Sequence, residues 1–424
     1  MTRVHPQAPP AVRWIVRTLE EAGYETWAVG GAVRDALLGR NTGDWDLATR
    51  AHPGQVRKLF RRTVPIGVEH GTVGVLSDDG TLYEVTTFRR DVETDGRHAT
   101  VSFADTVEED LSRRDFTINA VAWHPLRKEM RDPFGGVADL EDGILRAVGT
   151  ASERFAEDYL RILRALRFAA RFRLEVHPDT WSALCAGSQH LIGLSAERIR
   201  EELLKVLQGD ATPSGALELY RVAGALPVLY PEFAAVAEAD RVRWGHALAT
   251  VDRLPPARPF LRLAALLRVV SPKAAAQVLV RLRLSNAQVD EAARRAGAPP
   301  LPHATSDDAA FREWLRAVGP DDLSAVTRLA LAEARAAGDV PGAAAVVASW
   351  RRARGVLRGR PPLRVGELEL DGRDLIRLGM RPGPRFGSLL EELLTWVLED
   401  PARNRKELLE AEALRRVSEK RNGG

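Results

Sequence analysis

The sequence changes character near residue 150, and this change limits the folds that the chain can adopt. Before it, short apolar segments alternate with turn residues, a pattern that predicts strands mixed with short helices. The strands expected there are 24–29, 44–49, 71–76 and 82–88. After residue 150, apolar residues recur with the period of a helix to about residue 355, as in the single long helix expected for 153–173. The pattern therefore predicts an α/β N-terminal part followed by an all-α remainder.

The composition only limits the number of domains, the class of protein and the kinds of site that the chain can form. The 424 residues suffice for roughly two to four domains, and 45% apolar with 28% charged residues is ordinary for a protein with a sizeable core. A net charge of +3 does not by itself indicate nucleic acid. The single cysteine, Cys185, excludes an intramolecular disulfide and a cysteine-based zinc site. Because neither a signal peptide nor an apolar run of about 18 residues is found, we expect a cytoplasmic protein without a membrane partner.

A pair of glycines marks the first candidate site. Gly30 and Gly31 lie between the expected strand 24–29 and a short expected helix, 32–38. Two glycines at such a junction let the backbone approach a phosphate group closely, and the start of a helix favours an anion. Arg34 lies one turn into the helix, and its fork-shaped guanidinium group can donate two hydrogen bonds to a triphosphate.

Two aspartates follow this junction. Asp44 and Asp46 are two residues apart on an expected strand, so their side chains leave the same face. Their mutual repulsion would be removed by Mg²⁺ ions, which prefer carboxylate oxygens and can activate an attacking hydroxyl. An isolated Asp-x-Asp is usually a solvated strand edge or turn. An Asp-x-Asp that follows a glycine pair in this order is a far more specific indicator of a metal and phosphate site than an isolated Asp-x-Asp.

These segments resemble a known family. Gly30-Gly-x-Val-Arg34-Asp35-x-Leu-Leu-Gly39 followed by Asp-x-Asp is similar to the head signature of polymerase-β-like nucleotidyltransferases, in the class II branch of bacterial CCA-adding enzymes and poly(A) polymerases. The resemblance implies that Asp44 and Asp46 are catalytic and bind Mg²⁺, and that Gly31 and Arg34 contact the nucleotide. It also implies a third carboxylate, for which Glu84 is the candidate.

A second motif extends the resemblance. Arg113-Arg114-Asp115-Phe-Thr-Ile-Asn119-Ala resembles the family's motif at every fixed position. The match implies that Arg114 lies near the bound nucleotide and Asn119 near its sugar. A basic helix start with an acidic neighbour is the ordinary alternative.

A third motif falls on the helix expected for 153–173. Glu157 and Asp158 precede Arg161 by four and three residues, the spacing of a common surface ion pair. The family's Glu-Asp-x-x-Arg element selects the incoming base, so the resemblance implies that Asp158 and Arg161 read the base. It further implies nucleotide contacts for Arg164 and Arg167.

The family's organisation implies four parts. They are a catalytic nucleotidyltransferase head at 1–149, a helical neck for base recognition at 150–207, a helical body at 208–360 and a helical tail that binds tRNA at 361–424. The body resembles the remnant of a phosphohydrolase domain. It retains His246, but Arg268 and Val269 stand where a His-Asp pair would lie, so we expect no phosphohydrolase activity.

The function that the resemblance implies is template-independent addition of C, C and A to the 3′ end of tRNA, from CTP and ATP, with release of pyrophosphate. Alternatives are partial addition of CC or of A alone, poly(A) polymerisation, and a noncatalytic RNA-binding protein on the same scaffold. The segment 89–98 is only slightly shorter than the family's flexible loop, which favours retained A addition.

Overall fold

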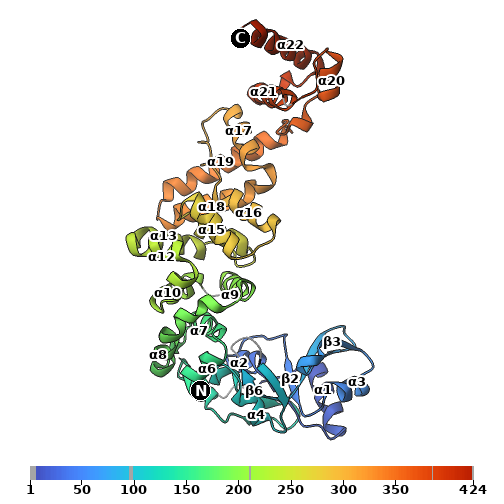
Figure 1. The fold of residues 1–424 in the computed structure, drawn as a ribbon, viewed down its shortest axis with the longest axis vertical. Coiled ribbons are helices and arrows are strands. Elements are labelled where there is room, and N and C mark those ends of the chain that lie inside the picture. The colour runs from blue at the N-terminus through green and yellow to red at the C-terminus, as the bar shows by residue number, and fades with distance from the viewer. Residues whose placement is uncertain (1–5, 95–98, 210–211, 384, 423–424) are drawn as a thin grey trace. The chain divides into compact units, whose positions relative to one another are not determined.

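The chain forms two compact units. The computed structural model describes residues 6–94, 99–209, 212–383 and 385–422. Contacts divide the chain into Met1–Pro231 and Glu232–Gly424. Within the described residues every strand belongs to the first unit, and the second is built from helices (Figure 1). The predicted α/β head and helical remainder are therefore confirmed. The four-part division at 149, 207 and 360 stays a prediction.

A mixed sheet organises the first unit. Its strand order is β3-β4-β5-β2-β1-β8-β9, and each neighbouring pair is antiparallel except β2 with β5. The strands of this sheet are β1 Thr26–Val29, β2 Asp46–Thr49, β3 Thr63–Gly67, β4 Thr72–Leu76, β5 Leu82–Thr87, β8 Ala122–His124 and β9 Glu129–Arg131. Strands predicted near 24–29, 71–76 and 82–88 are present. The strand predicted over 44–49 begins only at Asp46.

Helices cover both faces of the sheet. Along β1, Trp27 and Val29 face a cluster that includes Phe88 and Leu111, whereas Ala28 faces a second cluster. All four residues of β1 are buried, because a central strand covered on both faces has no solvated side. The helices of this unit are α1 Pro10–Glu21, α2 Gly31–Leu37, α3 Pro53–Leu59, α4 Val107–Ser112, α5 Gly136–Glu141, α6 Ala151–Glu157, α7 Leu160–Phe172, α8 Pro178–Gly187, α9 Ala196–Gln208, α10 Pro213–Val222 and α11 Ala225–Leu229.

Two small strand pairs accompany the main sheet. They are the hairpin of β6 Arg89–Thr94 with β7 Ala99–Phe103, and the parallel pair β10 Ile144–Leu145 with β11 Glu175–Val176. The hairpin occupies the segment on which the prediction of A addition depends. Residues 95–98 of that segment lie outside the described residues, so the prediction stays open.

The long helix predicted for 153–173 is wrong in its middle. α6 ends at Glu157 and α7 begins at Leu160, and Asp158 between them has an extended backbone with φ −158° and ψ 102°. One carboxylate oxygen of Asp158 accepts a hydrogen bond from the backbone N–H of Leu160 at 3.0 Å. A short polar side chain that satisfies a backbone donor in this way favours a helix start over a continuous helix.

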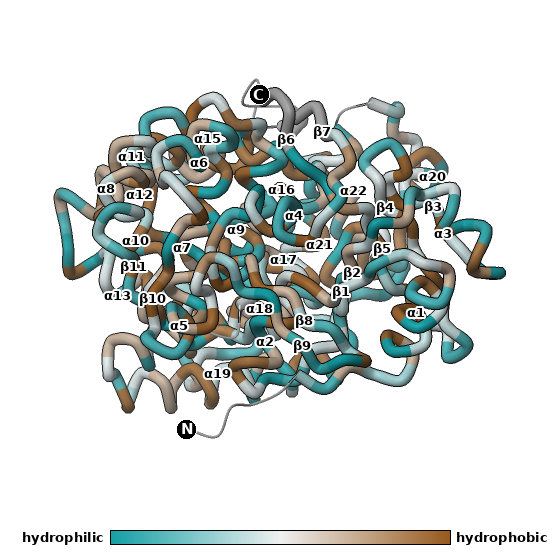
Figure 2. The backbone as a smooth tube through the Cα atoms, turned by 90° about the horizontal axis from the view of Figure 1, so that it is seen from below, coloured by the Kyte–Doolittle hydropathy of each residue, from teal (hydrophilic) through white to brown (hydrophobic). Residues whose placement is uncertain are grey.

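The second unit has its own core. Apolar residues of α17, α21 and α22, among them Phe311, Leu393 and Leu409, form one cluster. Its helices are α12 Pro231–Ala239, which begins at the boundary, α13 Arg241–Asp252, α14 Pro259–Leu267, α15 Pro272–Arg281, α16 Asn286–Ala296, α17 Asp308–Val318, α18 Leu323–Ala336, α19 Val340–Arg358, α20 Gly372–Arg377, α21 Arg385–Glu399 and α22 Lys406–Asn422. Hydrophilic and hydrophobic stretches follow one another at short intervals along the tube of Figure 2, as helices with one buried face require.

His246 and Arg268 have structural contacts in this unit. The Nε2 atom of His246 lies 3.1 Å from the carbonyl oxygen of Glu333, and the Nε of Arg268 donates to the Glu333 carboxylate at 2.6 Å. Both side chains therefore join their helices to α18. Over the described residues, no helix combines the length and the apolarity needed to cross a bilayer.

Candidate nucleotide-binding site

A polar cavity of about 570 Å³ lies in the first unit, where the sheet meets α7 and α9. Seven arginines and five carboxylates line it, so it can hold a polyanion beside a cluster of acidic groups. The predicted site residues that line it are Gly31, Arg34, Asp46, Arg114, Asp158, Arg161 and Arg164, together with Glu84, the candidate third carboxylate. Asp44 and Arg167, although described, are not among its lining residues.

The turn from β1 into α2 requires glycine. Gly30 has a φ of 73°, in the region that side chains other than glycine rarely adopt. A Cβ atom there would also lie 2.9 Å from an Nη atom of Arg114 and 3.8 Å from a carboxylate oxygen of Asp46. The absence of a side chain at this position therefore lets the arginine and the aspartate approach the same turn.

Asp46 and Glu84 line the sheet end of the cavity, and Asp44 lies close enough to act on Asp46. Because β2 and β5 run parallel with Leu47 opposite Val85, Asp46 lies beside Glu84. Burial raises the pKa of Asp46 to about 6, with further contributions from the charges of Asp44 and then Glu84, and Arg114 partly opposes them. Asp44, just before β2, is exposed. The three groups are thus within electrostatic reach of one another.

These groups suit a hard divalent cation. Carboxylate oxygens are the ligands that such ions prefer, and a positive charge would relieve the repulsion that raises the Asp46 pKa. In the part of the chain that the structure describes, no three His, Cys, Asp or Glu side chains form a preassembled metal cluster. Binding would therefore have to draw the carboxylates together.

A chain of hydrogen bonds positions two of the arginines that line the cavity. Arg34 donates to the Asn119 side-chain oxygen at 2.6 Å, Asn119 donates to Asp115 at 2.9 Å, and Arg164 donates to Asp115 at 2.7 Å. Burial opposes ionisation of Asp115, but Arg164 and Asn119 outweigh it, and the pKa of Asp115 is lowered. Asn119 thus orients Arg34 and Asp115, whose carboxylate in turn holds Arg164.

Aromatic rings complete the support of Arg34. Its guanidinium carbon lies 4.3 Å from the ring centroid of Phe172 and 5.2 Å from that of Phe168. Burial lowers the pKa of Arg34, and the adjacent Asp35 opposes this effect. A cation held between rings and hydrogen-bond acceptors has little freedom, which favours a fixed binding geometry.

The predicted base readers are engaged with protein partners. Asp158 accepts a hydrogen bond from Arg198 of α9 at 2.7 Å. Arg161 pairs with Glu157 and donates to the carbonyl oxygen of Arg113 at 3.2 Å. Arg161 thus forms the ion pair with Glu157 and also lines the cavity. A base that binds to Asp158 or Arg161 must share or displace these protein contacts.

Arg167 points elsewhere. Its Nε donates to Glu202 at 2.7 Å, and both side chains are almost fully buried. Arg167 lines a separate hollow with Arg171 and Lys205. Its observed contacts join α7 to α9, and its predicted contact with the nucleotide has no counterpart in them.

Sequence reasoning missed Asp110, Asp115 and Arg198 as site residues. Asp110 pairs with Arg114 at 3.0 Å, as Asp115 and Arg198 pair with Arg164 and Asp158. Asp115 stands in the quoted motif directly after two arginines, a signal that could have indicated it. Arg198 is 40 residues from its partner, and nothing local in the sequence indicates that contact.

Comparisons with known proteins show which family the chain resembles in sequence and fold. Residues 26–146 match the family described as "Poly A polymerase head domain", and residues 173–236 match "Probable RNA and SrmB- binding site of polymerase A". The CCA-adding enzyme of Geobacillus kaustophilus is 34% identical over 407 residues, which cover 94% of each chain. That of Levilactobacillus brevis is 44% identical over 218 residues, so the chain spans about half, 54%, of its length.

A solved structure extends the likeness to the fold. The crystal structure of Bacillus stearothermophilus CCA-adding enzyme in complex with CTP superposes with a TM-score of 0.77 at 30% identity, and covers 98% of this chain and 100% of that one. Nucleotidyltransferases of this kind generally use a divalent metal ion. With a relative this similar over nearly its whole length, the chain belongs to the CCA-adding enzymes, the class II tRNA nucleotidyltransferases.

Proposed function

We propose that this protein adds C, C and A to the 3′ end of tRNA without a nucleic-acid template, using CTP and ATP and releasing pyrophosphate. The observation that carries the proposal is one cavity lined by Asp46, Glu84, seven arginines and the Gly30-Gly31 turn. The Bacillus stearothermophilus enzyme in complex with CTP supports a nucleoside triphosphate as the ligand. We also place the protein in the cytoplasm, where these substrates are found.

The reaction is a phosphoryl transfer. The 3′-hydroxyl oxygen of the tRNA loses its proton to water and bonds to the α-phosphorus, the bond from this phosphorus to the bridging oxygen breaks, and pyrophosphate leaves with its electrons. Asp44 and Asp46, with Glu84 beside them, would hold Mg²⁺, which when bound lowers the pKa of the attacking hydroxyl and neutralises the leaving group. No separate general base is needed in this scheme.

The arginines bind and orient the triphosphate. Arg34 and Arg164 are fixed by the Asn119 and Asp115 hydrogen bonds, and Arg114 is held by Asp110, so their guanidinium groups meet the phosphates with little reorganisation. Gly31 lets the backbone approach the same phosphates. Positioning of this kind supplies most of the catalysis in phosphoryl transfer.

Asp158 and Arg161, which also line the cavity, select the base. Asp158 can accept from the exocyclic amino group that cytosine and adenine share, and Arg161 can donate to a ring acceptor. A base with the wrong pattern would leave one of these desolvated groups unpaired, at roughly 1–3 kcal/mol. Uracil and guanine are disfavoured on this basis.

The decisive experiment supplies tRNAs that end at the discriminator base, at C and at CC, each with CTP, ATP or both. Wild-type protein should extend all three to CCA with both nucleotides, whereas a partial enzyme would stop after CC or act only on the CC-ended tRNA. Long A tracts would instead indicate a poly(A) polymerase.

Substitution of the carboxylates tests the mechanism. Asp44→Asn and Asp46→Asn should each lower the rate by roughly 10³-fold or more, because several kcal/mol of charge stabilisation depend on them, while tRNA binding stays unchanged. Asp78→Asn, in an exposed turn of the same unit, is the matched control. Near-normal addition by either site variant would defeat the proposal.

A further inference from the structure

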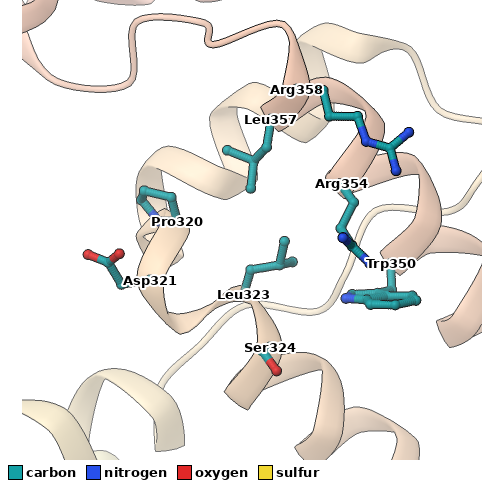
Figure 3. A pocket seen from close by; sticks show the side chains of 8 residues that line it. All are labelled: Pro320, Asp321, Leu323, Ser324, Trp350, Arg354, Leu357 and Arg358. Atoms are coloured by element: carbon teal, nitrogen blue, oxygen red, sulfur yellow. The ribbon is translucent and has the colours of Figure 1, made fainter.

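The second unit has a hollow of about 450 Å³ between the turn that precedes α18 and the C-terminal half of α19. Figure 3 shows Leu323 and Leu357 directed toward its centre, with Trp350 and Arg354 at one side and Arg358 at the rim. The volume falls within the roughly 300–1,000 Å³ typical of small-ligand sites. Every residue that lines it belongs to Glu232–Gly424, so it is distinct from the nucleotide-binding cavity.

The floor of the hollow is apolar and fixed. Leu323 is buried in the core of the unit, and Trp350 and Leu357 pack against that core while staying half-exposed. Trp350, Arg354 and Leu357 are spaced by four and three residues on α19, so they share one face of the helix. The indole is therefore held at its base and offers part of its surface to the hollow.

The rim is cationic. The guanidinium carbon of Arg354 lies 5.0 Å from the centroid of the Trp350 ring, and both Arg354 and Arg358 are exposed. Within the described chain, neither of these arginines pairs with a carboxylate. The acidic residue at the rim, Asp321, is almost fully exposed and already lies 3.8 Å from Arg364. Positive charge thus dominates beside an aromatic face.

This combination matches unpaired RNA. Every base has a π-face that stacks on an indole or a guanidinium, and its flanking phosphates complement unpaired arginines. Charge complementarity favours a polyanion over a protein of mixed charge, because the rim carries two unpaired arginines and its carboxylate, Asp321, already faces Arg364. We propose that the hollow binds an unpaired base of the tRNA, stacked on Trp350 beside Arg354, with Arg358 on an adjoining phosphate.

The inference rests on the proposed function only for the identity of the RNA. It goes beyond that function because it assigns base stacking to one site in the helical unit. Phosphate contacts alone would be spread over the surface and would be insensitive to which arginines are removed.

The experiment compares two double variants of equal charge. Arg354→Gln/Arg358→Gln removes the hollow's cations, and Arg351→Gln/Arg352→Gln removes two arginines from the same helix that do not line it. Equilibrium dissociation constants are measured for full-length tRNA without CCA and for a short hairpin of its acceptor stem. The hollow variant should bind the tRNA roughly tenfold more weakly and the hairpin normally, with KM for CTP unchanged. The control should stay within about twofold for both RNAs.

Trp350 is tested separately because it also packs in the core. Trp350→Leu should weaken tRNA binding by roughly tenfold, and Trp350→Phe should retain most of the affinity, since a phenyl ring still stacks. Thermal unfolding checks that both variants are folded.

Equal losses in the two double variants, equal losses on hairpin and tRNA, or unchanged tRNA affinity would each overturn the proposal. Unchanged tRNA affinity would leave the hollow to a protein partner. Because binding is measured without nucleotide addition, this result is independent of the catalytic tests of the proposed function.

Discussion

At the scale of single residues, Asp46 shows how the site opposes the stability of the fold. Its pKa is raised from 3.8 to about 6 by burial and then by Asp44 and Glu84. The folded state therefore holds this proton more tightly than the unfolded state does. As the pH rises from about 4 to about 6, ionisation of Asp46 lowers the free energy of unfolding, and above pH 6 the full cost is present.

Asp46→Asn should remove this cost. In EDTA at pH 7.5, we expect the variant to exceed the wild-type protein in free energy of unfolding by at most roughly 3 kcal/mol, since each pKa unit corresponds to about 1.36 kcal/mol. The difference should disappear near pH 4, where the wild-type carboxyl is protonated. Denaturant titrations at the two pH values measure it, with Asp78→Asn as the control. A variant that is less stable at pH 7.5 would contradict the electrostatic explanation.

Residues whose partners are close in sequence were the predictable ones. The glycine pair, Arg34 and the two aspartates form short motifs, and the structure brings Gly31, Arg34 and Asp46 to one cavity. The Asp115–Arg164 and Asp158–Arg198 contacts join residues 49 and 40 positions apart. Such contacts depend on how α7 and α9 pack, which local patterns do not encode.

At the scale of elements, the break between α6 and α7 gives the site its shape. The helical spacing of apolar residues continues through 153–173 and predicts one helix. The Asp158 side chain, however, accepts a hydrogen bond from the backbone N–H of Leu160, as a helix-capping residue does. The extended backbone at Asp158 leaves its other carboxylate oxygen to Arg198. In a continuous helix, the backbone at Asp158 would be helical and its side chain would point in a different direction. The break between α6 and α7 therefore positions Asp158 at the cavity.

Arg198 should therefore influence which base is accepted. In Arg198→Gln, Asp158 loses its charged partner and gains freedom, and a charge-assisted hydrogen bond of roughly 1.5–3 kcal/mol is lost. We expect the preference for CTP over UTP, expressed as kcat/KM on tRNA ending at the discriminator base, to fall by about tenfold. Glu201→Gln on the exposed side of α9 should leave the preference unchanged. Equal preferences in wild type and Arg198→Gln would show that Arg198 does not orient the reader.

At the scale of the whole molecule, the sequence predicted that an α/β part precedes a helical part, but it did not predict where one compact unit ends and the next begins. Strand-like and helical periods differ so strongly that the change near residue 150 is visible directly. Contacts instead separate the chain at Pro231, because α6 to α11 pack as part of the first unit. Periodicity identifies helices but not their partners, so it cannot say which helices share a core with the sheet.

The contact boundary has a testable consequence. All residues that line the nucleotide-binding cavity lie between Val29 and Arg198, and the clusters on both faces of the sheet belong to the first unit. A fragment of residues 1–231 should therefore fold cooperatively and bind CTP within about threefold of the full chain, as measured by calorimetry. Its affinity for tRNA should fall by more than roughly tenfold, because the hollow at Trp350 and its unpaired arginines are removed. Arg161→Ala in the fragment, which removes a guanidinium from the cavity, should weaken CTP binding. A folded fragment that does not bind CTP would show that the first unit is not sufficient for nucleotide binding. A fragment that binds tRNA as tightly as the full chain would show that the second unit does not contribute to tRNA affinity.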